Sequence, residues 1–163
     1  MSKINKYKFQ LLLFSAACCL SFSSCTQIEL FEKNTVIPNY KWQQNFIASG
    51  DFVITDTVSA YGIYLVLRHT DAYQYNNIWL NIGLQPPGDS MRIQKINLKL
   101  GDDANGWEGA GMNDIWEVRE LLNGQPRRFK LAGKYSFNIS QIMRDNPLLH
   151  IMSVGLRLEK KKD

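Results

Sequence analysis

Few side chains in this 163-residue sequence are suited to catalysis or metal binding. Its two histidines, His69 and His150, are far apart in the chain, and all three cysteines lie within the first 25 residues. A zinc site needs about four nitrogen, sulfur or oxygen ligands, usually at recognisable spacings, and no such spacing is present. There is also no Gly-x-Ser-x-Gly nucleophile motif. The sequence therefore predicts no catalytic residues, no metal and no cofactor, and we expect a protein that is not an enzyme. A hydrolase is the weakest hypothesis, because it rests only on scattered acids: Asp71, Glu108, Asp114 and Glu117.

The loop at 101–108 is rich in oxygen ligands but lacks the spacing of a calcium loop. Its Asp, Asn and Gly residues do not alternate in the pattern that wraps a calcium ion. The same residue types favour tight turns. A turn is therefore the expected structure.

The aromatic residues are the strongest remaining signal for binding. Trp79 alternates with Asn77 and Asn81 on one side of an expected strand. Tryptophan and arginine often anchor protein interfaces, so Arg68, Asn77 and Trp79 are our candidate partner-binding residues. The alternative is a glycan-binding module at the cell surface, because an exposed aromatic ring can stack on a sugar.

The N-terminal segment predicts export and a lipid anchor. Lys3, Lys6 and Lys8 precede the mostly apolar stretch Leu11–Phe22, which is too short to span a membrane and has the form of a signal peptide. Small residues then lead into Cys25, as in a bacterial lipoprotein signal. We expect Cys25 to carry the lipid; Cys18 and a plain secretory signal are the alternatives. The expected organisation is a signal peptide at 1–24, a tether at 25–41 and a domain at 42–160.

Removal of the three N-terminal lysines would reduce the formal charge of +4 to nearly zero. A nearly neutral body lacks the basic surface that binds nucleic acid, so no nucleic-acid partner is expected. We expect a membrane contact through the lipid, with palmitate or a similar acyl chain, and protein partners in the cell envelope. The outer membrane is the expected location.

The body alternates apolar and polar residues with a period of two, which is typical of strands with one buried face. Runs of this kind occur at 61–69, 75–84, 96–100, 115–121, 135–139 and 151–158. Turn-forming residues separate them. The pattern predicts an all-β fold, an antiparallel β-sandwich of the jelly-roll type. Only Ser140–Arg144 suggests helix, as one short turn near the C-terminus.

Several blocks of the sequence resemble the GldH family of gliding-motility lipoproteins of the Bacteroidetes. The blocks are Asp56–Tyr61, Ile63–Tyr73, Tyr75–Leu80, Pro86–Ser90, Gly106–Gly109, Asp114–Arg119 and Gln141–His150. The resemblance implies an envelope-anchored lipoprotein that supports gliding or the assembly and stability of an envelope machine. It implies no catalytic residues.

Overall fold

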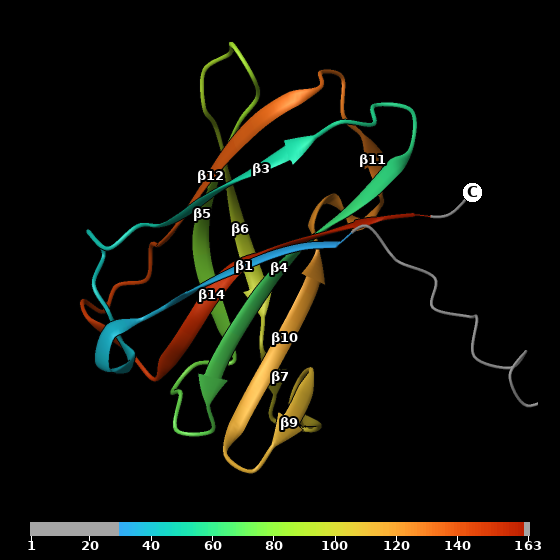
Figure 1. Cartoon of the computed structure of the whole chain (residues 1–163). Helices are drawn as coiled ribbons and strands as arrows, with labels where there is room; N and C mark the ends of the chain where they lie inside the picture. Colours follow the sequence, from blue (N-terminus) through green and yellow to red (C-terminus); the bar gives the residue numbers. More distant parts are fainter. Residues whose placement is uncertain (1–29, 162–163) are drawn as a thin grey trace, which may run out of the picture.

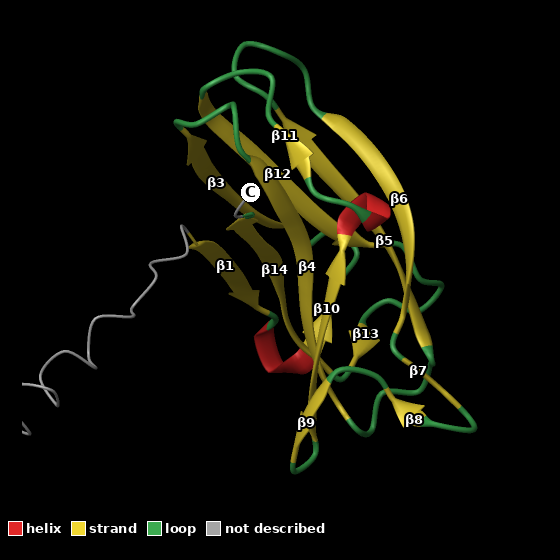
Figure 2. Ribbon diagram, turned by 90° about the vertical axis from the view of Figure 1, so that its right-hand side faces the viewer, coloured by secondary structure: helices red, strands yellow, loops and turns green. Residues whose placement is uncertain are grey.

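The computed structural model describes residues 30–161, which form two antiparallel sheets packed face to face (Figures 1 and 2). Sheet 1 contains, in order, β1 (Leu30–Val36), β14 (Ile151–Lys160), β4 (Ala60–Thr70), β10 (Ile115–Leu121) and β9 (Ala110–Met112), with β11 (Arg127–Arg128) also paired to β4. Sheet 2 contains β3 (Ala48–Ile54), β12 (Gly133–Gln141), β5 (Asn77–Gln85) and β6 (Arg92–Lys99). Short pairs join β13 (Leu148–Leu149) to β2 (Lys41–Trp42) and β7 (Gly101–Asp102) to β8 (Gly106–Trp107). Two 3₁₀ turns, η2 (Pro38–Tyr40) and η3 (Leu122–Gly124), complete the elements.

The strand order confirms the predicted all-β jelly roll. The long strands occur in two sets of four, β1-β14-β4-β10 and β3-β12-β5-β6. Successive long strands therefore cross from one sheet to the other, except β5 and β6, which pair with each other in sheet 2. This is the arrangement of a double Greek key.

The core lies between the two sheets and follows the alternation in the sequence. Leu65 and Leu67 of β4 point inward from sheet 1, and Ile78 and Leu80 of β5 point inward from sheet 2; all four are fully buried. Burial of one such side chain contributes about 1.5–3 kcal/mol. The apolar face of each long strand therefore determines which side of it meets the other sheet.

Two local expectations need correction. The sandwich begins at Leu30, because residues 30–36 form β1 and pair with β14, so the segment before it is shorter than the expected tether at 25–41. The helical turn predicted at Ser140–Arg144 is wrong: β12 continues to Gln141, and the next residues form an irregular loop. In addition, a bulge between Ile151 and Ser153 interrupts the alternation at the start of β14, so that Ile151 and Val154 both lie in the core.

The sandwich has two ends that differ in their loops. We call the end where β1 begins and β14 ends the tether end; it also carries loops 55–59, 86–91 and 122–132. The opposite end, called the far end, carries loops 71–76 and 142–147. Along one side the edge strands β1 and β3 contact each other. On the other side η3 lies beside the gap between β10 and β6 (Figure 2).

Candidate functional site

Trp79 lies on the outer face of sheet 2, as the alternation predicts. Its neighbours Ile78 and Leu80 are fully buried, whereas the Trp79 side chain is 38% exposed. Asn77 and Asn81 lie on the same outer face, since side chains two residues apart on a strand point the same way. Antiparallel pairing places Lys95 opposite Asn81 and Asn97 opposite Trp79 on β6. We call this area the Trp79 surface.

A groove of about 450 Å³ lies beside Trp79 at the far end, lined in part by Tyr75, Asn77, Lys95 and Met143. The Lys95 ammonium group lies 4.9 Å from the centre of the Trp79 ring, a cation–π contact. The Asn77 amide donates a 2.7 Å hydrogen bond to the Asn97 side-chain oxygen. These contacts hold the groove's polar side chains in fixed positions.

The loop after β12 forms one wall of this groove and is held by buried Gln141. The Gln141 amide nitrogen donates to the Asp145 carbonyl oxygen at 3.1 Å, and its oxygen accepts from the Met143 backbone N–H at 2.8 Å. The Tyr75 hydroxyl donates a 2.6 Å hydrogen bond to the Asp145 carboxylate. This bond raises the pKa of Tyr75 above its usual value, so the phenol stays protonated near neutral pH. The wall is therefore preorganised.

The structure brings Asn77 and Trp79 together but places Arg68 elsewhere. Arg68 belongs to β4 of sheet 1 and points outward, away from sheet 2. Its guanidinium pairs with the Glu117 carboxylate of neighbouring β10, which also binds Arg119 at 2.6 Å. Arg68 and Trp79 thus lie on opposite outer faces of the sandwich, and the three candidate residues do not form one surface.

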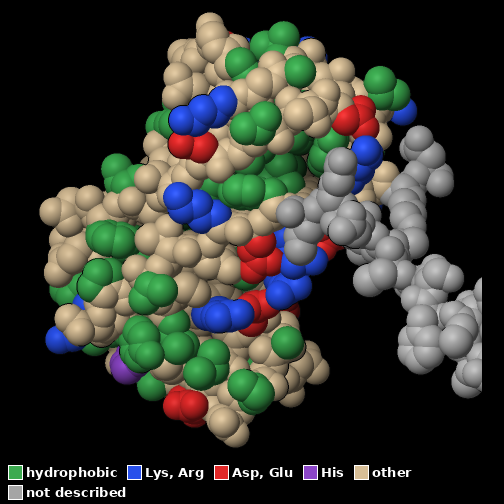
Figure 3. All heavy atoms as spheres, viewed as in Figure 1, with side chains coloured by type: hydrophobic (Ala, Val, Ile, Leu, Met, Phe, Trp, Pro, Cys, Tyr) green, Lys and Arg blue, Asp and Glu red, His purple; other side chains and the backbone are tan. Residues whose placement is uncertain are grey.

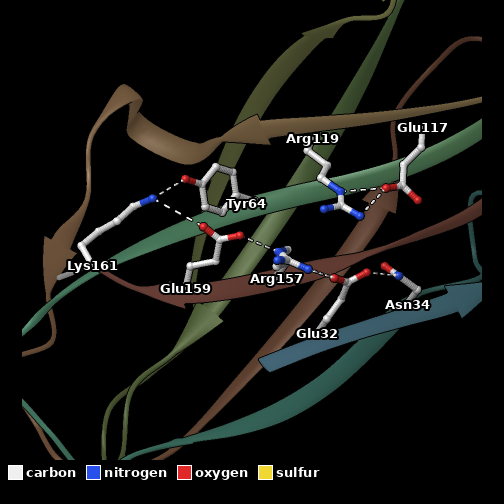
Figure 4. A network of polar contacts seen from close by, with 8 residues as sticks. All are labelled: Glu32, Asn34, Tyr64, Glu117, Arg119, Arg157, Glu159 and Lys161. Atoms are coloured by element: carbon white, nitrogen blue, oxygen red, sulfur yellow. Dashed lines mark hydrogen bonds and ion pairs between the residues drawn. The ribbon is translucent and has the colours of Figure 1, made fainter. Parts of the chain in front are cut away.

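The outer face of sheet 1 carries a network of charged side chains that the sequence did not predict (Figure 4). Arg157 bridges Glu32 of β1 and Glu159 of its own strand, with nitrogen–oxygen distances of 2.7 Å to each. Lys161 extends the network to Glu159 at 3.5 Å and to the Tyr64 hydroxyl at 2.8 Å. Figure 3 shows acidic and basic side chains lying next to one another on the face of the molecule turned to the viewer.

Packing of the side chains in this network covers part of the outer face. Val66 points outward on β4, yet it is only 1% exposed. Its antiparallel partners are Arg119 and Gly155, and Gly155 has no side chain, so neighbouring side chains must account for the burial of Val66. Burial raises the pKa of Glu32, but hydrogen bonds from Arg157 and Asn34 more than offset this, so its pKa lies below the usual value. The network is therefore partly buried, and we expect it to stabilise the folded protein.

The two histidines do not belong to a cluster of metal ligands in the described part of the chain. His69 is fully buried at the end of β4, where its ring lies 4.6 Å from that of Trp107 and its Nδ1 donates to the Thr70 carbonyl oxygen at 2.9 Å. Burial lowers the pKa of His69, which keeps the ring neutral. Among residues 30–161, no three His, Cys, Asp or Glu side chains gather closely enough to hold a metal ion. In loop 101–108, backbone N–H groups of Ala104 and Asn105 bind the Asp102 carboxylate, as in a tight turn.

Cys25, the expected lipid site, lies outside the described residues. Within residues 30–161, no helix has the length and hydrophobicity needed to cross a membrane.

Comparison with known proteins identifies the family. The chain is 25% identical over 142 residues to the gliding motility lipoprotein GldH of Flavobacterium johnsoniae, covering 80% of this chain and 87% of that protein. The family model described as GldH lipoprotein matches residues 29–158, which include both main sheets except the last two residues of β14. The chain therefore belongs to the GldH lipoprotein family.

Proposed function

We propose that this protein is a non-enzymatic lipoprotein of the cell envelope that supports gliding motility by binding a protein partner at the Trp79 surface. Family membership and the name of the Flavobacterium johnsoniae relative support the link to motility. The partner is a component of a larger envelope machine whose assembly or stability depends on this contact.

A lipid on Cys25 would hold the protein at the membrane, which we propose to be the outer membrane. The apolar stretch followed by Ser23-Ser24-Cys25 supports processing at that cysteine. One acyl chain binds a membrane only reversibly, whereas two or more give a stable anchor. The five residues from Cys25 to Leu30 would span at most about 17 Å. Lipidation would therefore keep the tether end close to the bilayer.

The exposed Trp79 ring beside a preorganised groove is the observation that carries the proposed partner contact. Tryptophan loses little conformational freedom on binding and is enriched among residues that dominate binding energy. The groove lies at the far end, away from Leu30, where a partner meets no obstruction from the membrane.

A protein partner is favoured over a glycan by the contact between Lys95 and Trp79. Sugar binding on an aromatic side chain needs an open ring face, and the Lys95 ammonium lies over one face of this ring. The surrounding asparagines would suit a sugar, so a glycan remains the alternative ligand to test.

The test compares Trp79→Ala with wild type in pull-downs from detergent-solubilised membranes. We expect loss of the partner, because truncation of a dominant interface residue costs about 2 kcal/mol or more, a reduction in affinity of about 30-fold. Val53→Ala is the matched control, since Val53 is 66% exposed on the outer face of the same sheet. Identical partners from wild type and Trp79→Ala would disprove the contact. Quenching of tryptophan fluorescence by one polysaccharide, absent in Trp79→Ala, would favour the glycan alternative.

A further inference from the structure

An apolar cavity opens between the two sheets near the tether end, and its lining includes Leu122 of η3. Its volume is about 440 Å³, within the range of small-molecule sites. Its lining reaches the core from both sheets, through Ile63 and Leu156 of sheet 1 and Ile82 and Leu84 of sheet 2. Leu122 of η3 lies at its mouth. A cavity with such walls favours a flexible apolar chain over water.

The mouth of this cavity carries three cationic side chains without a carboxylate partner. Arg127, Arg128 and Lys130 are exposed and line the opening. No carboxylate among residues 30–161 lies within ion-pair distance of any of them, whereas nearby Arg92 pairs with Asp89 at 2.8 Å. The Arg127 guanidinium also lies 5.8 Å from the ring centre of buried Phe129, which links the cations to the apolar lining. An acidic group on the ligand would complete the charge balance at the mouth.

The mouth lies at the end of the protein that faces the membrane if Cys25 is lipidated as proposed. β11 pairs with the first residues of β4, and β14 separates β4 from β1. Strands lie about 4.8 Å apart, so β11 is about 15 Å from β1, at the end where β1 begins. Basic groups that come close to a membrane surface are attracted to its anionic lipids.

We propose that this cavity binds the acyl chain of an anionic membrane lipid, with the acidic head group held by Arg127, Arg128 and Lys130. The apolar walls accept the chain, the cations select the negative head group, and the short tether brings the mouth to the source of the lipid. This site is separate from the Trp79 surface, and it does not depend on the partner proposed there.

The test uses photo-crosslinking of the full-length protein in cells. Cells are supplied with a fatty acid that carries a diazirine in its chain, which they incorporate into their lipids. After irradiation, the protein is purified and its peptides are mapped by mass spectrometry. We expect phospholipid adducts on the cavity peptides around Leu84, Leu122 and Phe129.

Two variants and a control make the outcome specific. Leu122→Trp, which fills the mouth, should abolish these adducts. Arg127→Gln/Arg128→Gln/Lys130→Gln should reduce them at least tenfold, because each of the three cations strengthens the attraction to an anionic lipid. Lys41→Gln/Arg144→Gln, which removes exposed cations at the far end, should leave them unchanged. Circular dichroism confirms that each variant is folded.

Three results would overturn the proposal. One is the absence of adducts on cavity peptides from folded wild type. Another is equal labelling of wild type and folded Leu122→Trp. The third is a crosslink joining the cavity to the lipid of the N-terminal cysteine peptide, which would identify the protein's own acyl chain as the occupant. None of these results changes the pull-down at Trp79, so failure here is distinguishable from failure of the proposed function.

Discussion

Arg157 provides a quantitative test of the charged network on the outer face of sheet 1. Its side chain is 18% exposed, and those of its partners Glu32 and Glu159 are 23% and 24% exposed. Exposed ion pairs contribute about 0–1 kcal/mol, and loss of one partner from a buried pair costs about 3–5 kcal/mol. Two pairs of intermediate burial therefore give about 1 kcal/mol each. We expect Arg157→Met, which keeps the long apolar stem, to lose about 2 kcal/mol of stability at pH 7.

The stability lost in Arg157→Met should become smaller at acidic pH. The hydrogen bond with Arg157 lowers the pKa of Glu159, and the net effect on the Glu32 pKa is also downward. A carboxylate with a depressed pKa stabilises the fold above its unfolded pKa, and this contribution disappears as the pH falls through the folded pKa. The difference between wild type and Arg157→Met should therefore shrink below about pH 4.5.

Urea unfolding followed by tryptophan fluorescence measures this effect. A loss of about 2 kcal/mol would lower the urea midpoint by about 1 M for a domain of this size. Arg68→Met is the matched control, because Arg68 pairs with Glu117 on the same face but its side chain is 49% exposed; we expect a loss below about 1 kcal/mol. Equal losses in the two variants, or a loss at Arg157 that is the same at pH 4 and pH 7, would refute the reasoning.

Two further predictions concern His69 and Cys25. Burial lowers the pKa of His69 below the ordinary value of about 6.5, so the unfolded chain gains a proton there more readily than the folded protein as the pH falls below 6.5. The free energy of unfolding therefore falls with the pH. Measured by urea unfolding, the free energy of unfolding should fall less in His69→Phe than in wild type between pH 6.5 and 5.5, by up to about 1 kcal/mol. The same pH dependence in both proteins would show that His69 is not responsible. Replacing Cys25 with Ala should move the protein from the membrane to the soluble fraction of lysed cells, because the acyl chains are lost. Retention in the membrane fraction would contradict the lipid assignment.

The alternation of residue types predicted which side of each long strand faces the core, since burial of the apolar face dominates strand orientation. It did not reveal β1. In Leu30–Val36, Lys33 and Thr35 lie on the same side of the strand as Phe31, so an edge strand at the rim of the sandwich shows no apolar period. The position of β1 is therefore determined by its pairing with β14 rather than by an apolar period in its own sequence.

The candidate residues show a second limit of sequence reasoning. A period of two tells which face a residue occupies, but not which sheet its strand joins. Arg68 and Trp79 lie on consecutive strands, and the topology assigns those strands to different sheets. The network around Arg157 was missed for a similar reason, because Glu32 and Arg157 meet only through the pairing of the first and last strands.

The antiparallel pairing of β1 with β14 has a mechanical consequence for a protein anchored at its N-terminus. All seven residues of β1 have a partner in β14, starting with Leu30 opposite Glu159. A pull on the N-terminus, resisted at the Trp79 surface, runs along the axis of β1. It loads these strand contacts together in shear rather than opening them one after another like a zipper. If the N-terminus is anchored as proposed, β1 is thus oriented to carry the load without peeling from the sheet.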